Sequence, residues 1–296
     1  MITLARKIIE KPGIIRRAPK KSLDLALTSM TRVHTEAVWR QRAVRRRAHS
    51  LPAPLVVSIT SYPARFHTLA PTLKCLLSQS LRADATVLWL GEGSFGSLPG
   101  EVLALQDYGL DIRVTRDLGP FTKIIPSLRG FPDAFIVTAD DDAYYGRNWL
   151  KQLVHGYDKM APTVVCHRAH RVRLSKLGRP LSYRCWDWEV QEPGTSPYLF
   201  PTGVGGVLYF PGAFSEEVRD EAVFLSLAPK ADDLWLYWME RRRGLAVTTL
   251  GHRAPIINWS GSQKVGLNNS NVDGLVNNDL YIEKLFSLYG LPMYVN

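Results

Sequence analysis

Cysteines are scarce in this sequence, and long apolar runs are missing. The three cysteines among its 296 residues (Cys75, Cys166 and Cys185) are scattered and form no CxxC pair. This pattern excludes a disulfide scaffold, argues against a structural zinc site and favours a reducing compartment. No apolar run approaches the roughly 18–20 residues of a spanning helix. Nor does an apolar block of about 7–15 residues follow the basic N-terminus, so we expect a cytoplasmic protein without a signal peptide.

An excess of acidic residues is also lacking, and the positive charge gathers at one end. The formal net charge is +10, and residues 1–50 contain 13 Lys or Arg against three acids, whereas the rest of the chain is neutral. A neutral body argues against a nucleic-acid partner. Apolar residues at three- and four-residue steps predict a helix from Ser22 to about residue 48. This basic segment, residues 1–48, either lies on an anionic membrane surface, peripherally on the inner face of the plasma membrane, or packs on the body or a neighbouring subunit.

Short apolar strands alternate with helices in the first part of the body. We expect strands over 55–59, 86–90, 112–114 and 135–138, with helices over 69–77, 99–108 and 124–128 between them. This rhythm predicts an α/β fold, a Rossmann-like and mostly parallel sheet flanked by helices, with a basic helical N-terminal extension over residues 1–50. Ligands of such sheets bind beyond the carboxyl ends of the strands. Three polar segments fall at those ends, namely Thr60–Arg65, Glu92 and Asp140–Asp142.

The acidic triplet Asp140-Asp141-Asp142 directly follows the fourth expected strand. In an extended chain alternate residues share a face, so Asp140 and Asp142 are expected to point together and Asp141 away. Two neighbouring ionised carboxylates favour a cation between them, and oxygen ligands suit Mg²⁺ or Mn²⁺ together with phosphate oxygens. The sequence has no GxxxxGK[ST] motif and is therefore not that of a P-loop enzyme. A plain acidic surface turn is the alternative.

A strand that ends in this triplet, about 85 residues after a Val-Ser-Ile-Thr strand, resembles the DxD motif of GT-A fold glycosyltransferases. The resemblance covers about residues 54–260 and is to bacterial family-2-type enzymes that build surface polysaccharides. It implies that Asp142 and Asp140 hold a metal, with His252 as a third ligand. A second match, Asp232-Asp233 at the start of an expected helix, implies that Asp233 is the catalytic base. Without any chemistry, acids at that position would still stabilise the helix dipole.

Further candidates follow from the same resemblance or from residue type. On the donor side these are Thr60, Ser61, Tyr62, Arg65, Glu92, Lys123, Asp140 and Asp141, and on the acceptor side Gly205, Gly206, Trp186, Asp187 and Trp188. Each has a structural alternative, since a lysine can be solvent-exposed, a tryptophan can pack in a core and a Gly-rich turn can enter a strand. The GT-A domain over 51–296 would comprise a donor half (about 54–145), an acceptor half (about 146–260) and a tail (261–296).

The sequence therefore predicts a glycosyltransferase dependent on Mn²⁺ or Mg²⁺. It would move a sugar from a nucleotide-sugar, a UDP-sugar, to a hydroxyl of a glycan or lipid-linked glycan acceptor such as lipopolysaccharide or capsule. A catalytic base at Asp233 implies inversion at the anomeric carbon, although some retaining enzymes have a similar acidic pattern. Two alternatives stay open: a non-catalytic protein that binds a cation or a partner, and a nucleotidyltransferase, which also uses paired acids with Mg²⁺.

Overall fold

The computed structural model describes residues 20–42, 47–251, 256–262 and 278–291, with side chains from residue 27 onward. The strands are β1 (Leu55–Ser61), β2 (Ala85–Gly91), β3 (Leu110–Thr115), β4 (Phe135–Ala139), β5 (Val164–Cys166), β6 (Ala169–Arg171), β7 (Gly194–Ser196), β8 (Leu199–Pro201), β9 (Val207–Tyr209) and β10 (Val247–Thr249). The helices are α2 (Lys20–Arg40), α3 (Phe66–Leu77), α4 (Gly100–Leu103), α5 (Ile125–Gly130), α6 (Trp149–His155), α7 (Glu221–Leu227), α8 (Asp232–Arg242) and α10 (Asn278–Tyr289).

Eight strands form the main sheet, in the order β3-β2-β1-β4-β9-β5-β10-β7. The first four are parallel, in the register Val57 opposite Thr86 and Val137. Strand β9 runs antiparallel to both β4 and β5, and β7 runs antiparallel to β10. Strands β6 and β8 form a separate pair. The expected α/β fold with a mostly parallel sheet flanked by helices is confirmed, and the antiparallel strands all belong to the second half of the chain.

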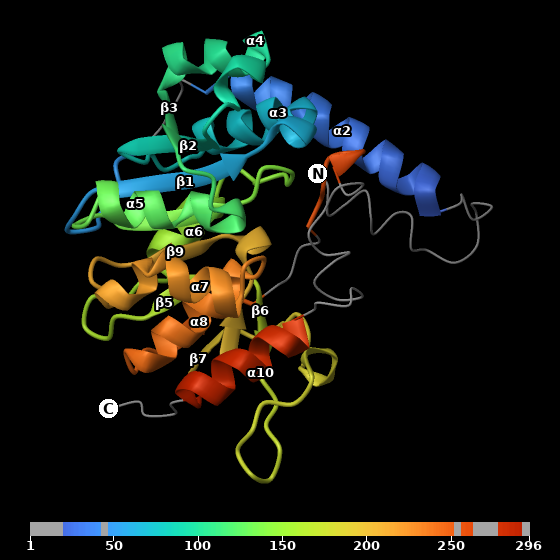
Figure 1. Cartoon of the computed structure of the whole chain (residues 1–296). Coiled ribbons are helices and arrows are strands. Elements are labelled where there is room, and N and C mark those ends of the chain that lie inside the picture. Colours follow the sequence, from blue (N-terminus) through green and yellow to red (C-terminus); the bar gives the residue numbers. More distant parts are fainter. Residues whose placement is uncertain (1–19, 43–46, 252–255, 263–277, 292–296) are drawn as a thin grey trace, which may run out of the picture.

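Alternate strand residues face opposite sides of the sheet, and each side has its own core. In β4 the side chains of Phe135 and Val137 join the core formed with α3 and α6, whereas Ile136 joins the core formed with α5 and α8. Figure 1 shows α2 and α3 at one end of the molecule and α8 and α10 at the other. Both faces of the central strands are thus buried, and their carboxyl ends remain for ligand contacts.

Two helices differ from the expected ones. The segment expected as one helix over 99–108 is a single α-helical turn, α4, followed by a 3₁₀-helix over Ala104–Tyr108 that ends at Gly109 with a φ of 96°. The helix of the N-terminal extension ends at Arg40, well before the expected residue 48. After that helix the Arg42 guanidinium lies 4.1 Å from the ring centroid of Trp39 and 4.0 Å from that of Tyr108, so cation–π contacts attach this end of the helix to the body.

Helix α2 packs on α3 through one face. Thr35 Oγ1 lies 3.6 Å from Cys75 Sγ, and Lys74 Nζ lies 2.7 Å from Glu36 Oε1. On its outer face Met30 is 55% exposed and Val33 72% exposed. Within the part of the chain that the structure describes, no helix is both long and apolar enough to span a bilayer. Packing on the body, one of the two expected roles of the extension, is therefore realised for α2.

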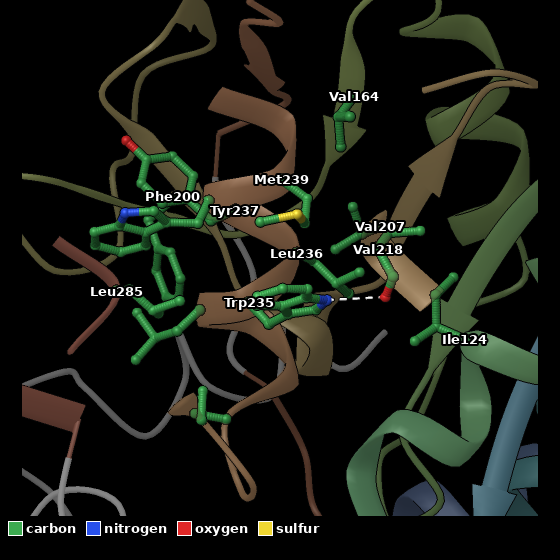
Figure 2. Close-up of a cluster of buried hydrophobic side chains, with 14 of the residues drawn as sticks. Ile124, Val164, Phe200, Val207, Val218, Trp235, Leu236, Tyr237, Met239 and Leu285 are labelled. Carbon is green, nitrogen blue, oxygen red and sulfur yellow. Dashed lines mark hydrogen bonds between the residues drawn. The ribbon is translucent and has the colours of Figure 1, made fainter. Parts of the chain in front are cut away.

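Helix α8 is buried on nearly all sides, as its sequence predicts. Trp235, Tyr237 and Trp238 are each fully buried, and the Trp235 indole N–H donates to the carbonyl of Val218 over 3.0 Å (Figure 2). Figure 2 also shows Leu285 of α10 beside this cluster. Full burial fixes the helix axis, and with it the position of the two aspartates in the first turn.

The same helix carries a buried acid, Glu240. Its side chain is fully buried, and neither carboxylate oxygen has a hydrogen-bond partner. Burial, together with the negative charge of Asp233, raises the pKa of Glu240 well above its usual range, and Arg241 only partly opposes this. The folded protein therefore holds a proton on Glu240 at a pH at which the unfolded chain has released it, so this group contributes less to stability as pH rises.

We expect Glu240→Gln to remove this dependence. Above pH 4.5, the ordinary pKa of this group, the free energy of unfolding of the wild type should fall relative to that of the variant by about 1.4 kcal/mol per pH unit. Urea unfolding at a series of pH values from 5 to 8 measures the difference. The matched control is Glu216→Gln, whose side chain is 86% exposed, and it should follow the wild-type slope. If the free energy of unfolding depends on pH in the same way in wild type and Glu240→Gln, Glu240 is not a buried protonated acid.

Candidate functional site

A cavity of about 620 Å³ lies at the carboxyl edge of the parallel strands. Its wall on the β1–β4 side includes residues at or after the carboxyl ends of those strands: Thr60, Ser61, Tyr62, Arg65, Gly91, Ser94, Asp117, Asp140, Asp141 and Asp142. Its wall on the side of α8 and the irregular second half includes Lys123, Arg168, Tyr183, Trp188, Glu189, Thr202, Asp232, Asp233 and Asn278. The sheet topology thus brings the two acidic motifs to one cavity, as the carboxyl-edge rule predicts.

Arg65 holds two members of the acidic triplet. Its Nη1 lies 2.7 Å from Asp141 Oδ1 and 2.9 Å from Asp142 Oδ2. The Ser61 hydroxyl donates to Asp141 Oδ2 over 2.6 Å. The three side chains are only 5–11% exposed, so these are buried ion pairs. The expectation that Asp141 points away from its neighbours is wrong, because strand β4 ends at Ala139 and the triplet turns instead of continuing extended.

The backbone of the triplet is braced by residues distant in sequence. The Thr72 hydroxyl of α3 makes bifurcated contacts with the carbonyls of Asp141 (3.0 Å) and Ala143 (3.1 Å), and itself accepts the indole N–H of Trp259 over 2.7 Å. The backbone N–H of Trp259 donates to the carbonyl of Asp142 over 2.9 Å. The loop is therefore fixed from both sides and presents its carboxylates in a preorganised arrangement.

Lys123 joins the triplet to the first turn of α8. Its Nζ lies 2.7 Å from Asp140 Oδ1 and 3.1 Å from Asp232 Oδ2, and its side chain is only 8% exposed. The Ser58 hydroxyl of β1 donates to the Lys123 backbone carbonyl, which fixes the backbone of the lysine against the sheet. Burial alone would lower the pKa of Lys123, but the carboxylates of Asp140 and Asp232 outweigh it and raise this pKa well above the usual range. Lys123 is therefore a permanent cation.

Asp233 is held by a backbone group. The N–H of Gly203 donates to Asp233 Oδ2 over 2.9 Å. A Cβ at position 203 would lie 2.9 Å from Asp233 Oδ1 and 3.1 Å from Lys123 Nζ, so only glycine allows this approach. Burial and the charge of Asp232 raise the pKa of Asp233 to about 7. A carboxyl group with such a pKa is suited to exchange a proton near neutral pH.

A divalent cation at Asp142 and Asp140 would take the place of the two side chains that now pair with them, Arg65 at 2.9 Å from Asp142 and Lys123 at 2.7 Å from Asp140. Burial and the neighbouring Asp140 raise the pKa of Asp142 to about 6, which reflects like charges crowded together. Mg²⁺ is typically bound by one or two carboxylates plus phosphate oxygens and water. In the described ranges no group of three or more His, Cys, Asp or Glu side chains is arranged to hold a metal. A cation at Asp142 and Asp140 would therefore depend on ligand oxygens, and it would compete with Arg65 for Asp142.

Several expected site residues lie elsewhere. Glu92 does not line the cavity. Trp186 is 3% exposed and belongs to the core, and the backbone of Asp187 pairs with Arg171 at a strand-like bridge. Residue type alone does not indicate which residues of such loops face the cavity.

The two expected glycines have a packing role. A Cβ at Gly205 would lie 2.9 Å from Arg168 Cβ, and one at Gly206 would collide with the Trp149 indole, so both permit close packing and neither lines the cavity. The third expected metal ligand, His252, lies outside the described residues.

The cavity residues that the sequence did not single out include Arg168, Tyr183, Thr202 and Asn278, and Gly203 reaches the site only through its backbone N–H. Arg168 and Glu189 form an ion pair of 2.8 Å. No motif distinguishes Arg168 from the many other arginines, and Gly203 differs from its neighbouring glycines only through its contacts. The one signal in the sequence is the Gly-rich segment itself, in which the group that approaches the backbone is the Asp233 side chain rather than a ligand.

No protein-family model matches the chain, and no curated protein matches it. Among solved structures, S. aureus TarS 1–349 in complex with UDP is similar at 15% identity, over 69% of this chain and 59% of that chain, with a TM-score of 0.45. Mannosyltransferase PcManGT from Pyrobaculum calidifontis, in complex with GDP-Man and Mn²⁺, is similar at 15% identity, over 49% and 46%, with a TM-score of 0.30. The inositol-1-phosphate CTP transferase from T. maritima is similar at 11% identity, over 79% and 96%, with a TM-score of 0.37.

The chain thus spans less than two thirds of the TarS and mannosyltransferase structures. At these identities and TM-scores the likeness extends no further than the general α/β fold.

Proposed function

We propose that the chain is a glycosyltransferase that moves a sugar from a nucleotide-sugar, a UDP-sugar, to a hydroxyl of a glycan acceptor. The observation that carries the proposal is the meeting of the two acidic motifs in one cavity, bridged by Lys123 between Asp140 and Asp232. The acidic triplet lies at the carboxyl edge of the sheet, where such sheets bind a diphosphate, and Asp232-Asp233 begins the rigid buried helix α8. Neither an acidic surface turn nor a simple helix-dipole contact accounts for a buried lysine between them.

In this proposal Asp233 is the catalytic base. The acceptor hydroxyl attacks the anomeric carbon of the donor sugar and passes its proton to Asp233, while the bond from that carbon to the diphosphate oxygen breaks. The anomeric carbon then acquires oxocarbenium character, as in glycoside hydrolysis, and its configuration inverts. Lys123 positions Asp140 and Asp232 and keeps a positive charge beside the departing diphosphate. Arg65, Thr60 and Tyr62 line the donor side of the cavity.

The proposal includes Mn²⁺ or Mg²⁺ held by Asp142 and Asp140. When bound, such a cation supplies Lewis-acid stabilisation of the diphosphate charge. Asp141, which Arg65 and Ser61 already engage, keeps the loop in place and is not among the ligands.

A thermal-shift experiment tests the proposal. A ligand that binds the folded protein at 100 times its Kd stabilises it by about 2.7 kcal/mol. UDP with Mn²⁺ should raise the melting temperature by several degrees, whereas CTP without metal should not. A shift with CTP alone would favour a nucleotidyltransferase, and the absence of a shift with any nucleotide would favour a non-catalytic binding protein.

The transfer rate should depend on pH through Asp233. Because the base acts only when deprotonated, we expect the rate at saturating donor to rise about tenfold per pH unit below 7 and to level off above about 7. Asp232→Asn removes the charge that helps to raise this pKa, so the midpoint should move to lower pH. A pH–rate profile of both proteins measures the shift. If the midpoint of the variant is unchanged, the rise in rate below pH 7 does not report the deprotonation of Asp233.

We also propose that residues 1–48 bind an anionic membrane surface, where a lipid-linked acceptor for lipopolysaccharide or capsule would be presented. The support is the charge of this segment and the outer face of α2, where Met30, Val33, Arg32 and Arg40 are all exposed. Each basic residue near such a surface contributes about 1 kcal/mol. Full-length protein should sediment with vesicles containing anionic lipid and not with neutral ones; sedimentation at high salt without residues 1–48 would contradict the proposal.

A further inference from the structure

The loop from Trp186 to Glu189 places one indole in the core and the other at the cavity. Trp186 is 3% exposed, and its N–H donates to the carbonyl of Leu181 over 2.9 Å. Trp188 is 44% exposed and lines the cavity. An exposed tryptophan on a cavity wall is a large apolar surface that folding has left available to a ligand.

Contacts with His170 and Tyr183 fix the orientation of the Trp188 ring. The buried His170 ring stacks on it, with centroids 4.9 Å apart and an interplanar angle of 25°. The indole N–H donates to the carbonyl of Tyr183 over 3.3 Å, and the Tyr183 ring contacts its edge at 5.3 Å. His170 covers one face of the indole, so the opposite face is a preorganised platform that loses little conformational entropy when a ligand stacks on it.

Glu189, next to this platform, has a strained backbone. Its φ is 54°, and it is the one non-glycine residue with a positive φ in the part of the chain that is described. Its N–H donates to His170 Nδ1 over 3.0 Å, and its carboxylate receives the Arg168 guanidinium at 2.8 Å. Strain of this kind persists where the surroundings over-determine it, and such positions concentrate at ligand sites.

Hydrogen bonds through neighbouring residues connect the platform to Asp233. Arg168 Nη1 donates to Thr202 Oγ1 over 2.9 Å, and the next residue, Gly203, donates its N–H to Asp233. Ligand atoms stacked on Trp188 therefore lie along the wall that ends at the proposed base.

A polar group from another element completes this wall. Asn278 at the start of α10 lines the cavity, is 8% exposed and has a buried amide oxygen without a hydrogen-bond partner. The following residue, Asp279, accepts the backbone N–H of Tyr183 over 2.6 Å, which fixes this end of α10 against the platform loop. Asn278 therefore adds an amide side chain to the wall on which Trp188 and Glu189 lie.

We propose that Trp188, Glu189 and Asn278 form a subsite for a neutral pyranose ring of the acceptor; this rests on the proposed function. A pyranose offers a C–H face that packs on an indole and equatorial hydroxyls that reach a carboxylate, a guanidinium and an amide at its rim. The site has balanced charge because Arg168 pairs with Glu189, which suits a neutral sugar rather than an anion. The donor nucleoside lies at the other end of the cavity, where β1 and β2 end.

The test measures sugar binding and nucleotide binding separately in the full chain. Methyl pyranosides of glucose, galactose, mannose and N-acetylglucosamine are titrated by saturation-transfer NMR, with and without UDP and Mn²⁺. Wild-type protein should bind at least one of them, Trp188→Ala should bind it about 10-fold more weakly, and Trp188→Phe should keep most of the affinity. The matched control is Phe95→Ala, which removes a 46% exposed ring that does not line the cavity and should change nothing. The melting shift with UDP should be the same in all variants.

Three results would overturn the subsite: no glycoside binds to wild type, Trp188→Ala binds it equally well, or Trp188→Ala loses the UDP shift and keeps the sugar. The last result would assign the platform to the nucleoside. Failure of the proposed function looks different, since UDP would then give no shift in wild type while glycoside binding still reports on Trp188.

Discussion

Asp233→Asn should lower the rate of sugar transfer about 10³-fold and leave the fold unchanged. Asparagine keeps an oxygen that can accept the N–H of Gly203, now 2.9 Å from Asp233 Oδ2, but it cannot take the acceptor proton. Removal of a positioned general base typically costs 10²–10⁴-fold. The variant should bind UDP and Mn²⁺ as the wild type does, because the donor-side residues are untouched.

The matched control for this variant is Asp220→Asn. Asp220 also accepts a backbone N–H at the start of a helix, from Val223 over 3.2 Å, but it does not line the cavity. Asparagine caps helices about as well as aspartate, so the control should keep both stability and rate. Transfer is followed as release of UDP from a panel of UDP-sugars with and without acceptor. Turnover by Asp233→Asn within tenfold of the wild type would rule out its role as base.

Arg65→Gln should unfold at a temperature about 10 °C lower than the wild type. It leaves Asp141 and Asp142 buried without their cation, and breaking a buried pair by removing one partner costs about 3–5 kcal/mol. For a large domain each kcal/mol shifts the melting temperature by about 2–4 °C. The exposed pair of Arg116, which is 68% exposed, with Glu221 provides the control, because Arg116→Gln removes a pair worth about 0–1 kcal/mol.

The same variant tests the fit of the metal. Since Arg65 and a divalent cation compete for Asp142, Mn²⁺ alone should restore more of the lost melting temperature in Arg65→Gln than it adds to wild type. The double variant Arg65→Gln with Asp141→Asn should also recover part of it by removing one unpaired carboxylate. If Mn²⁺ acts equally on both proteins, Asp142 is not a ligand of the cation.

The parallel half of the sheet could be predicted from the sequence because its strands are buried on both faces. Leu55–Ile59 and Phe135–Ala139 are apolar except for one small hydroxyl residue each, Ser58 and Thr138, and each is followed directly by polar residues. The carboxyl-edge rule then places those polar residues in one cavity without further information. The antiparallel strands β7 and β9 have only three residues each, too few for a periodic pattern to separate them from loops.

The pairings within the site could not be predicted, because tertiary contacts decide them. Nothing near Arg65 in the sequence indicates that it contacts Asp141 and Asp142, and nothing near Lys123 indicates Asp232. Similarly, Trp186 and Trp188 have the same residue type and two-residue spacing, yet one packs in the core and the other does not. Their difference arises from the 3₁₀-turn at Tyr183–Cys185 and the strained backbone of Glu189.

The hydrogen bonds from Trp259 to Thr72 and Asp142 make the acidic loop depend on a segment that is synthesised after the parallel strands. Strands β1, β2 and β4 leave the exit tunnel long before Trp259, so the nascent chain can pair its parallel strands while the triplet still lacks both hydrogen bonds. Donor recognition would therefore be acquired only once Trp259 has emerged, and a polypeptide truncated before Trp259 would keep the parallel strands yet fail to organise the loop that follows them.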